Sequence, residues 1–362
     1  MRDYSTLGGK PGFGKKKIPM ELVQIRKNLA GPWRAVWNTL PADVKTFLNP
    51  YYRKYIANNR LFLVFWPTFR CNYECSYCPL HTKFDFATVY PKSSEKRWEH
   101  WVQALEKLPP AMIYVAGGEP FLYADLPDLL NNLPAKHELI GIVSNLSMPA
   151  RVIKKINNPI RLNASFHREC VSSEDFIGKV KELQESFHIM VNMVATPENL
   201  PAIAAIDALL KSHNISLHID PFVDTGFRYS DEQLALLKKH TKLDRASMPE
   251  FNDFSLKSCS AGRNYVNLMP NGDVFVCASG FQYVHSPLFA HVVGNQDTSH
   301  YRMKNLLDPD FSLNRLDISC ALPCQAYCDR DMAVIKVAGP PNESQMPAGN
   351  GTCSEASPAR VA

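Results

Sequence analysis

The segment Cys71-Asn72-Tyr73-Glu74-Cys75-Ser76-Tyr77-Cys78 places three cysteines within eight residues, directly after an apolar run at 61–66. Three thiolates are too few to complete a four-cysteine tetrahedral site. They can instead bind three irons of a four-iron cluster and leave the fourth iron open for catalysis. A zinc site completed by a distant ligand such as His81 is the alternative that the spacing leaves open.

The composition limits the kind of protein this chain can be. Its 45% hydrophobic and 21% charged residues are typical of a globular protein, and a net charge of +5 is mild for 362 residues. The Gly/Lys-rich run at 8–17 is interpreted as a solvated tail. No apolar stretch approaches the roughly 20 residues that cross a bilayer, and the N-terminus lacks a secretory signal. We therefore expect a cytoplasmic protein with no membrane span and no nucleic-acid partner, whose ten cysteines serve as metal ligands rather than disulfides.

Short apolar runs of strand type alternate with helical patterns through the first two thirds of the chain. The runs lie at 61–66, 112–116, 139–143, 160–165, 188–194 and 215–219. This alternation predicts a parallel sheet with right-handed crossovers, in which functional groups lie on loops at the carboxyl ends of strands. The periodicity fits an open sheet, a closed barrel and a partial barrel equally.

Two helix starts are marked by capping residues. Ser172 precedes Ser173-Glu174-Asp175 and an amphipathic pattern, which predicts a helix that begins at that point. Thr196 and Pro197 predict the start of another helix, with Thr196 as its cap.

Taken together, these residues resemble the radical S-adenosylmethionine superfamily. Its signature has three and then two residues between the cysteines and an aromatic residue before the last one, and Cys71, Cys75, Tyr77 and Cys78 match it in full. The second strand ends in Gly117-Gly118-Glu119-Pro120, which is similar to the second motif of the superfamily. In that motif the glycines let backbone approach a ligand and Glu119 faces an ammonium group, although alone the segment could be an ordinary turn. The resemblance covers about 61–222 and implies a partial (β/α)6 TIM-like barrel.

The resemblance also implies a mechanism. The open iron of a [4Fe-4S] cluster would bind S-adenosylmethionine, and an electron from the cluster would cleave it to methionine and a 5′-deoxyadenosyl radical that abstracts hydrogen from a substrate. A reducing partner such as flavodoxin or ferredoxin would supply the electron. Tyr77 would pack near the adenine. Ser144 and Asn145, after the third strand, would reach the ribose or methionine part, or would form only a polar turn.

A second group of cysteines follows in the last third of the chain: Cys259, Cys277, Cys320, Cys324 and Cys328. Between the first two, Pro270-Asn271-Gly272-Asp273 predicts a hairpin turn. The region resembles the auxiliary-cluster modules named SPASM and twitch. The full SPASM pattern has seven cysteines with two, five and three residues between its middle four. This chain has six cysteines in the region when Cys353 is included, and its middle group has spacings of three and three. The shorter twitch form, with one auxiliary [4Fe-4S] cluster held by Cys259, Cys277 and two of the other three, is therefore favoured.

Other uses of these cysteines stay open. A second auxiliary cluster could use Cys353 with Asp329 as an oxygen ligand, the whole group could bind structural zinc, or Cys353 could be a free thiol in the tail.

The sequence divides into five parts on this reading. They are a flexible basic tail with N-terminal helices (1–58), the radical S-adenosylmethionine partial barrel (59–228), a helical linker (229–257), a small cysteine-rich auxiliary-cluster domain with a β-hairpin (258–338) and a disordered tail (339–362).

Four residues are candidates for contact with substrate. His167, Glu169 and Cys170 follow the fourth strand, where His167 and Glu169 could bind hydroxyls or amines or move protons and Cys170 could donate a hydrogen atom in an epimerisation. Asp220, at the end of the sixth strand, is the last of the four, and His167, Cys170 and Asp220 are the catalytic candidates. The alternative is a polar loop with one half-buried thiol.

The leading interpretation is a radical S-adenosylmethionine oxidoreductase or epimerase that acts on a small polar molecule such as a sugar, aminocyclitol or glycoside. The seventeen residues between Cys259 and Cys277 are similar in number to those of aminocyclitol dehydrogenases in the twitch group. Modification of a ribosomally synthesised peptide is the second reading, although the first 58 residues are too short for the winged-helix recognition domain of many such enzymes. An iron–sulfur electron carrier or a zinc scaffold is the third, and the open-iron motif argues against it.

Overall fold

The computed structural model describes residues 60–78, 80, 86–157, 160–222, 227–240, 257–285, 301–320 and 335–337. All of them belong to one unit, Ala57–Ala362. The expected N-terminal tail and helices, most of the linker and the C-terminal tail lie outside the described residues. No helix in the described part of the chain is long and apolar enough to cross a membrane.

An eight-stranded sheet organises this unit, with the strand order β6-β5-β4-β3-β2-β1-β8-β9. The first six strands pair in parallel with their sequence neighbours, as expected for a partial barrel of strand–helix units. They are β1 (Leu61–Phe65), β2 (Ala111–Val115), β3 (Glu138–Ser144), β4 (Arg161–Ser165), β5 (His188–Ala195) and β6 (Leu217–Pro221). All six predicted strands are present, and the mixed α/β class with a parallel sheet is confirmed.

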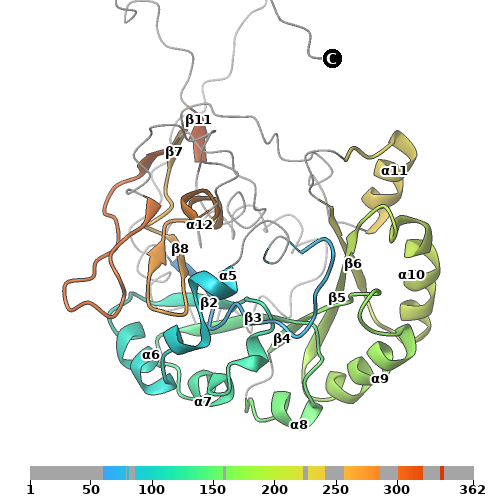
Figure 1. Cartoon of the computed structure of the whole chain (residues 1–362), viewed down its shortest axis with the longest axis horizontal. Helices are drawn as coiled ribbons and strands as arrows, with labels where there is room; N and C mark the ends of the chain where they lie inside the picture. The colour runs from blue at the N-terminus through green and yellow to red at the C-terminus, as the bar shows by residue number, and fades with distance from the viewer. Residues whose placement is uncertain are drawn as a thin grey trace, which may run out of the picture. The chain divides into compact units, whose positions relative to one another are not determined.

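Helices cover the outer face of this sheet and follow one another along it in Figure 1. They are α6 (Trp98–Leu105), α7 (Leu126–Asn131), α8 (Ala150–Ile153), α9 (Ser173–Gln184) and α10 (Ile203–Ser212). Alternate strand residues such as Leu162 and Val191 share one buried core with helix residues such as Val180. Because successive side chains of a strand point to opposite faces, the residues between them face the inside of the sheet.

The two capping predictions have different outcomes. Helix α9 begins as expected, because the Ser172 hydroxyl accepts a hydrogen bond from the Asp175 N–H at 3.1 Å. The Thr196 hydroxyl accepts from the Asn199 N–H at 3.2 Å, but a turn and the 3-10 helix η3 (Leu200–Ala202) follow, and α10 begins only at Ile203. Pro201 has no N–H with which to extend an α-helical ladder from this turn, so the helix prediction at Thr196 was wrong by several residues.

The predicted hairpin is present between β8 (Tyr265–Leu268) and β9 (Val274–Phe275), which pair antiparallel. Gly272 adopts a φ of +95°, the conformation for which glycine is favoured in a tight turn. β8 also pairs in parallel with β1, so the hairpin extends the barrel sheet. The strands β7 (Lys257–Cys259), β10 (Ile318–Cys320) and β11 (Ile335–Val337) form a separate three-stranded sheet in the order β10-β7-β11.

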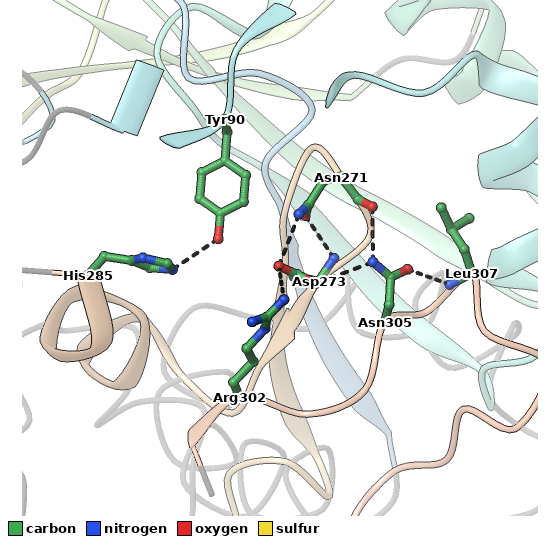
Figure 2. A network of polar contacts seen from close by, with 7 residues as sticks. All are labelled: Tyr90, Asn271, Asp273, His285, Arg302, Asn305 and Leu307. Atoms are coloured by element: carbon green, nitrogen blue, oxygen red, sulfur yellow. Dashed lines mark hydrogen bonds and ion pairs between the residues drawn. The ribbon is translucent and has the colours of Figure 1, made fainter. Parts of the chain in front are cut away.

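A polar network holds the segment after residue 300 against this hairpin turn (Figure 2). The buried Asp273 carboxylate accepts hydrogen bonds from the side chains of Asn271, Arg302 and Asn305 at 3.0, 2.8 and 3.2 Å. The Asn305 amide also donates to the Asn271 carbonyl at 3.0 Å. These bonds satisfy a carboxylate that would otherwise be costly to bury at the turn.

Three further helices lie near the ends of the sheet strands: α5 (Phe86–Val89), α11 (Asp231–His240) and α12 (Ala278–His285), together with the 3-10 helices η1 (Lys92–Ser94) and η2 (Pro120–Leu122). A second buried cluster joins α5 to α12 through aromatic rings. Phe281 of α12 stacks on Phe86 at 4.3 Å and on Phe69 at 5.5 Å between ring centroids. At its edge the Tyr90 hydroxyl and Nε2 of His285 are hydrogen-bonded at 3.1 Å (Figure 2).

Candidate radical site

The loop after β1 carries the three clustered cysteines, and the two residues that precede the first of them are held in place. The buried Phe69 ring anchors it in the aromatic cluster. The Arg70 guanidinium donates two hydrogen bonds to the Glu95 carboxylate, at 2.9 and 3.1 Å, and a third to the Leu122 carbonyl at 2.6 Å. This bidentate pair has a defined geometry, so the backbone that leads into Cys71 is held in place.

The glycines of the second motif make room for this loop. A Cβ atom on Gly117 would lie 2.4 Å from the Thr68 carbonyl oxygen, and one on Gly118 would lie 2.2 Å from the Arg70 carbonyl oxygen. The Gly118 N–H donates to the Thr68 carbonyl at 3.2 Å, and the Glu119 N–H donates to the Arg70 carbonyl at 2.8 Å. These glycines admit the backbone that precedes the first cysteine, and the approach of a ligand to Gly117 and Gly118 stays a prediction.

Glu119 joins the ends of β2 and β3. Its carboxylate is fully buried and accepts hydrogen bonds from the Ser144 hydroxyl, the Asn145 N–H and the Phe121 N–H at 2.9, 2.7 and 3.2 Å. Burial raises the pKa of Glu119 to about 7, and the three hydrogen bonds oppose that rise. The next residue, Pro120, opens η2, where its missing N–H costs nothing. The expected contact of Glu119 with an ammonium group stays a prediction.

Asn145 brings the end of β3 to the first cysteine. Its amide nitrogen lies 3.8 Å from Sγ of Cys71 and donates to Oδ1 of Asn72 at 3.2 Å. The Tyr73 N–H also donates to Sγ of Cys71 at 3.4 Å. Ser144 and Asn145 therefore lie beside the cysteine loop as part of one polar group, and their contact with S-adenosylmethionine stays a prediction.

The loop after β4 lies directly on the cysteine loop. Nδ1 of His167 is 2.7 Å from the Tyr77 hydroxyl and 3.2 Å from Sγ of Cys75, and the His167 and Tyr77 rings stack at 5.9 Å. Burial lowers the pKa of His167 to about 4, so its imidazole is neutral at pH 7. The Glu169 carboxylate accepts from the N–H and the hydroxyl of Ser76 at 2.8 and 2.9 Å.

Cys170 follows on the same loop, with its Sγ 3.8 Å from that of Cys75. Ligand atoms of Cys75, Glu169 and Cys170 all lie within 4.8 Å of one another. The sequence predicted that His167 and Cys170 would face substrate, and the structure places both against a cysteine of the signature. Their catalytic role stays a prediction.

The donor set fits an iron–sulfur cluster. Cys71, Cys75 and Cys78 lie on one short loop, and none of the three is in a disulfide. Burial raises the pKa of Cys71 and of Cys75, so thiolates at these positions need a positive group beside them. Iron supplies that charge, and hydrogen bonds to the ligand sulfur, such as the one from the Tyr73 N–H to Cys71, are a usual means of tuning such clusters.

A family comparison agrees with this geometry. Residues 67–168 match the model of the Radical SAM superfamily. Residues 67–168 are a radical S-adenosylmethionine domain. The match includes the cysteine signature, the segment 117–120 and the start of the loop after β4. Members of this superfamily use a [4Fe-4S] cluster and S-adenosylmethionine.

Three solved structures are similar to this chain at low sequence identity. The crystal structure of Streptococcus suis SuiB has 18% sequence identity and a TM-score of 0.50, over 80% of this chain and 74% of that chain. SuiB bound to S-adenosylmethionine has 17% identity and a TM-score of 0.47, over 76% and 79%. anSMEcpe with bound AdoMet and a peptide has 14% identity and a TM-score of 0.46, over 69% and 78%. No curated protein sequence matches the chain.

Three of the predicted auxiliary cysteines lie in the described residues, and all three are buried. Cys259 is in β7, Cys277 precedes α12 and Cys320 is in β10. The Gly280 N–H donates to Sγ of Cys277 at 3.1 Å, and the Tyr301 hydroxyl donates to Sγ of Cys320 at 3.7 Å. Cys324 and Cys328, with Asp329 and Cys353, lie outside the described residues, so the auxiliary cluster stays a prediction.

Asp220 is part of a polar group on the inner face of the radical S-adenosylmethionine barrel. Its carboxylate accepts from the Asn192 amide at 3.1 Å and lies 3.3 Å from Nε2 of His218. On β4, the Asn163 amide donates to the Tyr114 hydroxyl of β2. The sequence analysis missed Asn163 and Asn192. Each is a single polar residue between apolar neighbours in a strand, and that pattern was a usable signal.

Proposed function

We propose that the protein is a radical S-adenosylmethionine oxidoreductase or epimerase that removes a hydrogen atom from a small polar substrate such as a sugar, aminocyclitol or glycoside. The observation that carries the substrate class is the polar inner face of the barrel, where Asn163, Asn192 and Asp220 lie on three adjacent strands. Oδ1 of Asn163 and Oδ1 of Asn192 have no partner among the described residues, and an apolar substrate would leave both without a hydrogen bond, at a considerable cost in binding free energy.

Three groups of residues would have separate roles in this reaction. Cys71, Cys75 and Cys78 would hold the cluster, which when bound supplies the electron for cleavage of S-adenosylmethionine and so starts hydrogen abstraction. Glu119 fixes the ends of β2 and β3 beside it. The stacked His167 ring and its hydrogen bond to Tyr77 lie against the buried Cys75 on the side of β4.

Two further parts belong to the proposal. One auxiliary [4Fe-4S] cluster, held by Cys259, Cys277 and two of the cysteines 320, 324 and 328, would accept the electron left when a substrate radical is oxidised. A reducing partner such as flavodoxin or ferredoxin would supply electrons to the first cluster.

Iron content and cleavage test this proposal together. We would reconstitute the full chain anaerobically, count iron and sulfide per chain, and measure 5′-deoxyadenosine after reduction with dithionite. The wild type should hold roughly eight irons as two four-iron clusters, and the triple variant Cys71/Cys75/Cys78→Ala should hold about four and lose cleavage. Zinc in place of iron, or cleavage by the triple variant, would refute the proposal.

Cys170→Ser is the matched variant for this experiment, because Cys170 lies 3.8 Å from Cys75 but outside the signature. If the three signature cysteines suffice, Cys170→Ser keeps the iron content and the cleavage of the wild type. Loss of about four irons in Cys170→Ser would instead identify Cys170 as a fourth ligand of the cluster. The fourth iron would then have no open coordination position, on which the proposed chemistry depends.

A further inference from the structure

The inner face of β4, β5 and β6 carries a row of polar side chains. Pairing places Ser165 opposite Asn192 and Asn192 opposite His218, so these residues share one face of the sheet. Asn163 lies two residues before Ser165, and Asp220 lies two residues after His218, so both point to that same face. The opposite face of the same strands is the apolar core beneath the helices.

Hydrogen bonding fixes which way the middle side chain of this row points. The Asn192 amide nitrogen lies 3.1 Å from a carboxylate oxygen of Asp220. An ionised carboxylate only accepts hydrogen bonds, so the Asn192 NH₂ must donate and its Oδ1 must point elsewhere. That Oδ1 is buried and has no hydrogen-bond partner among the described residues.

A second acceptor in the row is also unpartnered. Asn163 is only 6% exposed, and its amide donates to the Tyr114 hydroxyl, whose ring lies across Gly141. Its Oδ1 has no hydrogen-bond partner within the described part of the chain. Buried acceptors are nearly always paired in native proteins, and an unpaired one usually marks a missing partner.

Among the described residues, the unpartnered side-chain atoms of this row are therefore both acceptors, while Ser165 and His218 also lie on it and Nε2 of His218 lies 3.3 Å from the Asp220 carboxylate. Oδ1 of Asn163, Oδ1 of Asn192 and the Asp220 carboxylate all accept hydrogen bonds, and the carboxylate adds negative charge. The half-buried Met190 and Val194 lie on the same face of β5 between these groups and offer apolar contact. The complementary ligand has several hydrogen-bond donors, a positive charge at the Asp220 end and C–H groups between them.

We propose that Asn163, Asn192 and Asp220 bind the substrate of the proposed reaction, and that this substrate is a compact amino polyol. Its hydroxyl groups donate to the two asparagine oxygens, and its protonated amine lies against Asp220. This inference rests on the proposed function, since it narrows the small polar substrate to one that carries an amine.

Titration calorimetry with three related sugars tests the charge preference. Glucosamine, glucose and glucuronate are titrated at pH 7 into the anaerobically reconstituted full chain. Glucosamine should bind at least about tenfold more tightly than glucose, because it adds a charge-assisted hydrogen bond to Asp220, and glucuronate should bind most weakly.

Variants assign this preference to the row. Asp220→Asn should bring the affinity for glucosamine down to that for glucose, and Asn192→Leu should weaken both sugars. Asp310→Asn is the matched control, because Asp310 is an exposed carboxylate paired with Lys304. It should leave all three titrations unchanged. Iron content and urea unfolding of each variant show that any change in affinity comes from a folded, loaded protein.

The outcomes separate this inference from the proposed function. Equal affinity of the wild type for glucosamine and glucose, no binding of either sugar, or an amine preference that survives Asp220→Asn overturns the inference. If the same preparation still forms 5′-deoxyadenosine after reduction, the proposed function stands while the amino-polyol site fails. If no preparation forms it, the proposed function fails, whatever the sugars do.

Discussion

Gly118→Ala should displace the loop that carries Cys71. The new Cβ would lie 2.2 Å from the Arg70 carbonyl oxygen and 2.6 Å from the Phe69 carbonyl oxygen. Both are backbone atoms of the segment that leads into the first cysteine, so no side-chain rotation relieves the contact. The loop itself must move away from the end of β2.

The magnitude follows from the contacts that such a movement breaks. Overpacking of a well-packed site costs about 1–3 kcal/mol. The displacement also breaks the hydrogen bonds from the Gly118 N–H to Thr68 and from the Glu119 N–H to Arg70, each worth about 1 kcal/mol. Gly118→Ala should therefore lower the free energy of unfolding by about 3–5 kcal/mol, a large part of the stability of a typical domain.

Urea unfolding of the apo-protein and iron content after reconstitution measure the two effects. Gly178→Ala is the matched control, since Gly178 lies inside α9 and its added Cβ would meet no atom within 4 Å. That control should gain about 0.5–1 kcal/mol from helix propensity and keep its iron. The reasoning is refuted if Gly118→Ala unfolds like the wild type and binds the same amount of iron.

Three other substitutions test the framework around the site. Burial raises the pKa of Glu119 from 4.5 to about 7. As the pH rises from about 4.5 to about 7, the wild type should therefore lose about 3 kcal/mol of stability relative to Glu119→Gln. A pH-independent difference between the two in urea unfolding would contradict this. Asp273→Ala leaves Arg302 and two amides without their acceptor and should cost about 2–3 kcal/mol in thermal or urea unfolding, with a smaller loss for Asp273→Asn. Ser172→Ala removes the cap on the Asp175 N–H and should cost about 1 kcal/mol by the same assay, and no loss would show that α9 does not depend on this cap.

Local patterns in the sequence were enough to predict the parallel sheet. Each predicted strand is a short run rich in apolar residues, and alternate residues such as Leu162, Val191 and Ile219 are buried in the core that the helices share. The turn at 270–273 likewise predicted the hairpin, because its residue types favour one turn geometry. The pairing of β8 with β1 could not be predicted, since the two strands lie about 200 residues apart and no local signal specifies which strand edge a hairpin joins.

The site was predicted where motif and topology act together. Cys71 and Glu119 follow adjacent parallel strands, so their proximity follows from the order of the sheet. The contact of His167 with Tyr77 and Cys75 depends on how two loops fold back on each other, which strand order does not specify. Asn192 was missed although it is a single polar residue between apolar strand neighbours, because that pattern does not specify which side chains of the adjacent strands lie beside it.

The cysteine loop and the hairpin region belong to one packed structure. Phe69 lies two residues before Cys71, Phe281 lies four residues after Cys277, and their rings stack at 5.5 Å. A close-packed aromatic cluster transmits displacement rather than absorbing it. Movement of α12 would therefore displace the loop that carries the signature cysteines. The Asp273 network holds the hairpin that leads into Cys277 (Figure 2). It therefore also contributes to the position of the candidate radical site, from the other side of the aromatic cluster.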